Sequence, residues 1–238
     1  VASDGQYAYI IGGADIINGS TAAGYRYDPG ANTYLSIAAS PTATWSSAAV
    51  YLDGKIYKIG GFSTDTTASN AVEVYNIAGN NWTTVAPYPI AGGFISAFVR
   101  DHFIYAAGGA DSLLQGTFKA YRYDPANNVW DDSALADLPQ SRWGAASASF
   151  NGAGLIAGGF VNGSSIAKIS ATALQWNAQT NTWTALPDML LARARFGGVV
   201  RGCFFAIGGI SATGTVVNFV GTSENQEFDW LFYDGFGS

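Results

Sequence analysis

Five pairs of adjacent glycines constrain this chain more than any other feature of its sequence. Successive pairs are 48, 48, 50 and 50 residues apart. The pairs are Gly12-Gly13, Gly60-Gly61, Gly108-Gly109, Gly158-Gly159 and Gly208-Gly209. Each pair closes a short apolar run, such as Phe103 to Ala107, and short apolar runs between turns are typical of β-strands. Because glycine is unfavourable inside helices, a chain with 30 glycines at this spacing is predicted to consist of repeated strands.

Each repeat has room for four short strands. A turn such as Asp53-Gly54 precedes each run, and this chemistry favours a tight hairpin, so two strands precede each glycine pair. A third strand ends in an aromatic residue, and after a polar turn an aromatic residue opens a fourth strand. The aromatic residues of the fourth strands are Tyr34, Trp82, Trp130, Trp183 and Trp230. A period near 50 residues with four strands matches the length of one propeller blade.

The best copy of the repeat runs from Leu52 to Gly61 and continues through Tyr75 to Trp82. This pattern of an apolar run, a glycine pair and a spaced tyrosine and tryptophan resembles the kelch repeat. The resemblance implies an all-β, kelch-type β-propeller with five recognisable four-stranded blades in one domain, residues 1–238. The expected blades are about 1–40, 41–88, 89–138, 139–188 and 189–238.

The number of blades is left open by the repeats. Kelch propellers usually have six or seven blades, and this sequence has five repeats. The first repeat begins within its first hairpin, so one innermost strand is expected to be missing. The alternatives are a five-bladed ring or part of a ring with six or seven blades, and we favour the larger ring.

The composition excludes several classes of protein. Only 12% of the residues are charged, against about 25% in a typical domain, while 48% are hydrophobic, which predicts a packed core rather than disorder. The 11 Lys and Arg residues are scattered and the net charge is −6, so nucleic acid is not an expected partner. A single Cys and a single His predict no internal disulfide, no multi-histidine metal site and no cofactor. Glycines interrupt the longest uncharged stretch, so no membrane span is expected.

One face of the propeller is predicted to bind a ligand. In a four-stranded blade, the turn before the first strand and the loop after the second emerge on the same face. Four aromatic residues are expected there, and two arginines precede two of them at positions that the repeat makes equivalent. The set is Trp45, Phe94, Arg142, Trp143, Arg195 and Phe196. The loops add hydrogen-bonding side chains, namely Asp15, Asp65, Asp111 and Asn162. Aromatic rings and arginines suit sugars, side chains and carboxylates. The competing interpretation is that the aromatic residues pack between blades.

Three functions are compatible with this face. The first is a non-catalytic module, secreted or on the cell surface, that binds a carbohydrate or a protein; no catalytic residue is assigned, because the single His and Cys lie on the opposite face. The resemblance to kelch sialic-acid mutarotases implies the second, a sugar-converting enzyme. The third is a structural role in an extracellular assembly, in which the incomplete blade accepts an edge strand from a partner. The low charge favours an extracellular location.

Overall fold

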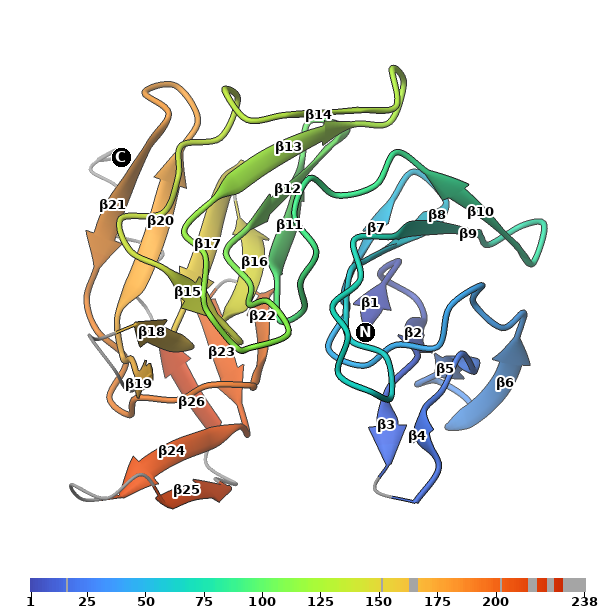
Figure 1. The fold of residues 1–238 in the computed structure, drawn as a ribbon, viewed down its shortest axis with the longest axis horizontal. Helices are drawn as coiled ribbons and strands as arrows, with labels where there is room; N and C mark the ends of the chain where they lie inside the picture. The colour runs from blue at the N-terminus through green and yellow to red at the C-terminus, as the bar shows by residue number, and fades with distance from the viewer. Residues whose placement is uncertain are drawn as a thin grey trace.

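The computed structural model describes residues 1–15, 17–150, 152–162, 167–201, 203–213, 218–221 and 225–228. All regular structure in this part of the chain is β-strand, arranged as sheets around a common centre (Figure 1). The described residues contain no helix that is long and apolar enough to cross a membrane.

Five antiparallel sheets form the blades, and each runs from its innermost to its outermost strand in chain order. Blade 1 contains β1 (Ala2–Ser3), β2 (Ala8–Ile11), β5 (Gly24–Asp28) and β6 (Thr33–Ile37). Blade 2 contains β7 (Ala48–Leu52), β8 (Lys55–Ile59), β9 (Val72–Asn76) and β10 (Asn81–Val85). Blade 3 contains β11 (Ser96–Arg100), β12 (Phe103–Ala107), β13 (Ala120–Asp124) and β14 (Val129–Asp131). Blade 4 contains β16 (Ala146–Phe150), β17 (Ala153–Ala157), β20 (Ala173–Asn177) and β21 (Thr182–Leu186). The described strands of blade 5 are β22 (Gly197–Arg201), β23 (Cys203–Ile207) and β26 (Asn225–Phe228).

Smaller sheets extend the loops that follow the glycine pairs. They are β3 (Ala14–Asp15) with β4 (Gly19–Ser20), β15 (Arg142–Trp143) with β18 (Phe160–Asn162) and β19 (Ala167–Ile169), and β24 (Ile210–Thr213) with β25 (Asn218–Gly221). We call the side of the molecule that carries these loops and the linkers between blades the mouth face. The predicted all-β architecture of four-stranded blades is confirmed, whereas the single-domain boundary stays a prediction.

Adjacent blades are joined by the repeated outer aromatic residues. The side chain of Asn80 accepts hydrogen bonds from Ala38 N and from the Tyr75 hydroxyl, both at 2.8 Å, and Trp82 Nε1 donates to Ala38 O at 2.8 Å. Side chains of blade 2 therefore bind the backbone of Ala38, the residue that directly follows the last strand of blade 1. The same bonds join Asn128 and Trp130 to Ala86, and Asn181 and Trp183 to Ala136. Trp230 lies outside the described residues.

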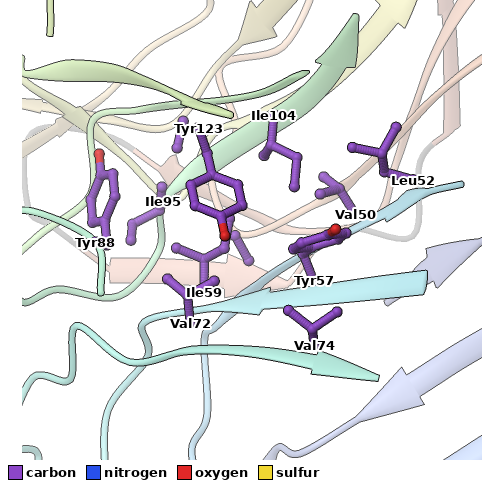
Figure 2. Close-up of a cluster of buried hydrophobic side chains, with 12 residues drawn as sticks. Val50, Leu52, Tyr57, Ile59, Val72, Val74, Tyr88, Ile95, Ile104 and Tyr123 are labelled. Carbon is purple, nitrogen blue, oxygen red and sulfur yellow. The ribbon is translucent and has the colours of Figure 1, made fainter. Parts of the chain in front are cut away.

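Apolar side chains fill the interfaces between adjacent blades beneath these bonds, and we call each such interface a joint. Between blades 2 and 3, the fully buried Ile59 and Val72 pack with Ile104 and Tyr123 in one cluster (Figure 2). The Tyr57 and Tyr123 rings lie with their centroids 6.1 Å apart. This packing across the joint makes each blade depend on its neighbour.

Blade 1 has an open inner edge. Its innermost strand β1 has two residues, which pair with Ala8 and Tyr9, so among the described pairings Ile10 and Ile11 bond only to β5. These two isoleucines are half-buried, whereas Lys58 and Ile59 at the same places in blade 2 are buried. The sequence predicts that this innermost strand is missing, whereas the two residues of β1 form a short strand in its place, because they pair with Ala8 and Tyr9. The edge-strand partner stays a prediction.

The glycine pairs bring each linker against the preceding blade. Gly108 has φ +67°, and a Cβ at this position would collide with Arg142 O. Gly109 N donates to that same oxygen at 2.8 Å. The linker backbone therefore touches the strand end at a distance that only glycine allows.

Replacing Gly108 by alanine should cost much more stability than replacing Gly54. Both glycines have positive φ, but a Cβ on Gly54 meets nothing within 4 Å. G54A should lose about 1–2 kcal/mol for the left-handed backbone alone. G108A adds the collision with Arg142 O and should lose at least about 3 kcal/mol in total. Urea unfolding of both variants measures the difference, and equal losses would contradict the role of this contact.

Candidate functional site

Four residues with left-handed backbones follow one another around the centre of the mouth face, at the entries to blades 2 to 5. They are Ser46, Phe94, Gly144 and Arg195, with φ between +54° and +61°, and each lies just before an innermost strand. We call them the mouth rim. Hydrogen bonds connect them from blade to blade: Phe94 N donates to Ser46 O at 2.8 Å, Gly144 N to Phe94 O at 3.1 Å, and Arg195 N to Gly144 O at 2.7 Å. A left-handed non-glycine residue costs on the order of 1 kcal/mol, so the rim is a constrained segment.

A cavity of about 640 Å³ lies below the rim. Innermost strands from all five blades line it, beginning with the residues that directly follow the rim. These are Ser47, Ile95, Ala145 and Phe196. A further hollow of about 290 Å³ is lined by the same strands nearer the opposite face. Small residues dominate both walls, so the centre of the ring is an open channel rather than a packed core.

Aromatic side chains pack against one another beside the rim. We call this group the aromatic pile; its members are Trp45, Phe62, Phe94, Trp143 and Phe160. Trp143 stacks on Phe160 with 4.0 Å between ring centroids, and Phe94 lies 5.2 Å from Trp143. On the other side of Phe94 stand Trp45, at 5.7 Å, and Phe62, also at 5.7 Å. The rings therefore cover one another. The predicted aromatic residues Trp45, Phe94 and Trp143 do meet at the mouth, but mainly as packing between blades 2, 3 and 4.

Arg195 lies on top of this aromatic pile. Its guanidinium carbon is 4.6 Å from the centroid of Phe94, 5.6 Å from Trp143 and 5.7 Å from Phe160. The residue is exposed, and no ion pair joins it to a carboxylate within the described part of the chain. Desolvation against the rings lowers the pKa of the guanidinium, which still stays protonated at neutral pH. Its donors are therefore available for an anionic group.

The structure aligns the arginines differently from the sequence analysis. Arg195 is a rim residue, equivalent to Phe94, whereas Arg142 lies two residues before the rim. The counterpart of Arg142 is Arg193, because each presents its carbonyl to the second glycine of the preceding blade, at 2.8 Å in both cases. Phe196 is likewise equivalent to Ile95, and it lines the channel rather than joining the aromatic pile.

The side chain of Arg142 is buried and forms hydrogen bonds inside the protein. It is 1% exposed, and its Nη1 donates to Gly158 O and to Thr172 O, while Nη2 donates to Thr172 Oγ1 at 2.7 Å. Burial lowers the pKa of this guanidinium to about 10. Arg142 is thus bound by blade 4 and does not reach a ligand at the mouth.

The predicted loop carboxylates shape their own loops. Asp15 accepts from the backbone N–H groups of Ile17 and Asn18, Asp65 from Ser63 Oγ and Thr67 N, and Asp111 from Leu113 N and Gln115 N. These bonds lower the pKa of Asp15 and of Asp65. Asn162 ends β18, and its side chain lies outside the described part. Among the described residues, no group of three or more His, Cys, Asp or Glu could hold a metal ion.

Sequence reasoning overlooked a set of exposed apolar side chains on the mouth face. Ile17 is 87% exposed, Leu113 79% and Leu190 90%, and each lies in a loop or linker of that face. Leu114 and Phe118 are also exposed, in the same loop as Leu113. Large apolar residues within otherwise polar loops were the available signal, because such positions are usually small or polar.

Comparison with known proteins agrees with this architecture. The family model of the kelch motif matches residues 46–87, which is the repeat of blade 2. A solved structure described as "Structure of YjhT" superposes with a TM-score of 0.76, over 93% of this chain and 78% of that chain, at 14% sequence identity. A likeness at this identity shows the fold. The search of curated proteins gives no match.

Alanine substitution should separate the two arginines. R142A removes the side-chain donor to Gly158 O and the bond from Nη2 to Thr172 Oγ1, leaves a cavity, and should cost about 2–4 kcal/mol of stability. R195A removes only an exposed contact with rings and should cost at most about 1 kcal/mol. Urea unfolding distinguishes them, and a loss for R195A as large as that for R142A would contradict the assignment of Arg195 to the surface.

Proposed function

This chain carries a kelch motif and has the fold of a kelch-type β-propeller, and we propose that it is a non-catalytic module that binds a protein partner through its mouth face. Arg195 would receive a carboxylate of that partner, and the exposed apolar side chains of the surrounding loops would pack around the contact.

The observation that carries this proposal is that Arg195 is held by aromatic rings and has no carboxylate partner among the described residues. The aromatic pile holds its guanidinium in place, while the described residues offer it no carboxylate. A positioned arginine loses less conformational entropy when it binds, and its planar fork matches a carboxylate with two parallel hydrogen bonds. Arginines of this kind, beside aromatic residues, are common energetic centres of protein interfaces.

The surroundings favour a protein over a carbohydrate. A sugar ring needs an open aromatic face, but the rings of Trp143, Phe160 and Phe94 are covered by one another. Ile17, Leu113 and Leu190 instead offer apolar side chains that a protein surface can bury. Binding of a carbohydrate remains the second candidate for this face.

The other functions stay predictions. The mutarotase alternative relied on Arg142 and Arg195 acting on one carboxylated sugar, and Arg142 is bound inside blade 4. The structural role relied on the open inner edge of blade 1. An extracellular location continues to rest on composition alone.

Selection from a random peptide library against the immobilised domain tests the proposal. The enriched peptides should share an acidic residue beside apolar residues. R195A should weaken their binding by about tenfold or more, since a charged hydrogen-bonded contact is lost. R195K should give an intermediate loss, because lysine keeps the charge without the fork.

R100A is the matched control. Arg100 ends β11 on the face opposite the mouth and pairs with Asp101 at 3.1 Å, so its removal changes the net charge equally without touching the mouth. L113S should also weaken binding, through lost apolar contact. Enriched peptides without an acidic residue, bound equally by the wild type and R195A, would refute the proposal.

A further inference from the structure

Three linkers place one residue at the same point between adjacent blades. The residues are Gly92, Arg142 and Arg193, and the carbonyl of each accepts the N–H of the second glycine in the preceding blade, at 2.8 Å in all three cases. Their backbones are therefore bound to blades 2, 3 and 4. The side chains of Arg142 and Arg193 reach the following blade.

In blades 4 and 5 that side chain is a buried guanidinium. Arg142 Nη1 donates to Gly158 O, and Arg193 Nη1 donates to Gly208 O at 2.9 Å. Both acceptors are the first glycine of a glycine pair. The two arginines are at most 1% exposed, so each blade encloses the cation with backbone carbonyls.

In blade 3 the corresponding position is Gly92, which has no side chain. A hollow of about 220 Å³ is found there, and both Gly92 and Gly108 line it. Gly108 is the first glycine of its pair and thus the counterpart of Gly158 and Gly208. The hollow therefore lies where the guanidinium groups lie in the next two blades.

The lining of this hollow is mostly apolar residues and glycine, with a few polar side chains among them. Tyr88 is one of the lining residues, its side chain is 1% exposed, and its hydroxyl has no hydrogen-bond partner among the described residues. Asp111 also lines the hollow and supplies a negative charge. Gln115, another lining residue, is exposed, so the hollow is reached from the mouth face. An uncompensated buried polar group is costly and calls for a partner.

We propose that this hollow is a socket for the guanidinium group of an arginine on the binding partner. Gly108 O would accept from the guanidinium as Gly158 O does from Arg142, and Tyr88 and Asp111 would add a hydroxyl and a charge. The proposal extends the protein-binding function, because it predicts an arginine in the same partner that presents a carboxylate to Arg195. It uses residues that the Arg195 contact does not use, so each of the two contacts can fail alone.

Titration of the isotope-labelled domain with N-acetyl-arginine amide, followed by amide NMR signals, tests the socket directly. Signals of Gly108, Gly109 and Thr117 should shift saturably. N-acetyl-citrulline amide has nearly the same shape without the charge and should bind at least about tenfold more weakly, since hydrogen bonds from a charged donor are the stronger ones. No saturable shift at these residues, or equal binding of the two compounds, would overturn the proposal.

Substitutions test whether the predicted residues form the guanidinium socket. D111N keeps the acceptor oxygen that holds the loop but removes the charge, and it should weaken binding roughly two- to fivefold. R195A should leave the titration unchanged, which separates this site from the proposed carboxylate contact. R142G opens the equivalent socket of blade 4, and ethylguanidinium should raise its Tm more than that of the wild type. If R142G does not fold, the wild-type titration alone decides.

Discussion

The structure depends on a backbone contact between each glycine pair and the linker to the next blade. At four joints a Cβ on the first glycine would collide with a linker carbonyl oxygen, and the second glycine donates its N–H to that same oxygen at 2.8–3.0 Å. The linker residues concerned are Thr44, Gly92, Arg142 and Arg193. Because the contact is made by backbone atoms, the side chain of the linker residue is free to vary, and the mouth rim follows two residues later at every joint.

The side chains beneath this common backbone differ from joint to joint. Where blade 1 meets blade 2, Lys58 forms a buried ion pair with Glu73 at 3.0 Å and hydrogen-bonds to Ser40 Oγ at 3.1 Å. At the next joint the equivalents are Tyr88, Ala106 and Tyr121, and at the third they are Leu138, Ile156 and Leu174. One register thus carries ionic, aromatic and aliphatic packing. Such differences discourage wrong pairing of blades, and one of the joints is left with an unfilled hollow.

The sequence predicted the parts of the molecule that backbone geometry repeats. Glycine pairs, hairpin turns and outer aromatic residues recur because the contacts they make recur, as the bonds of Trp82 and Asn80 to Ala38 illustrate. The linkers lack this regularity. The rim residues Ser46, Phe94, Gly144 and Arg195 lie 33, 33, 35 and 36 residues after the second glycine of the preceding pair. Because this spacing varies, an alignment based on the aromatic residues wrongly made Arg142 equivalent to Arg195. Spacing also gave no sign that Asp15 and Asp65 bind their own loops, or that glycine at position 92 leaves a hollow.

In the proposed interface, the exposed Arg195 on the aromatic pile at the mouth binds a carboxylate of the partner. A charge-swap cycle tests this pairing. It measures by calorimetry the binding of a selected acidic peptide to the wild type and to R195E, and the binding of the same peptide with its acid replaced by arginine to both proteins. Each single swap should abolish binding, and the double swap should restore a large part of it. Binding by the double swap that is as weak as by either single swap would contradict the direct pairing of Arg195 with the carboxylate.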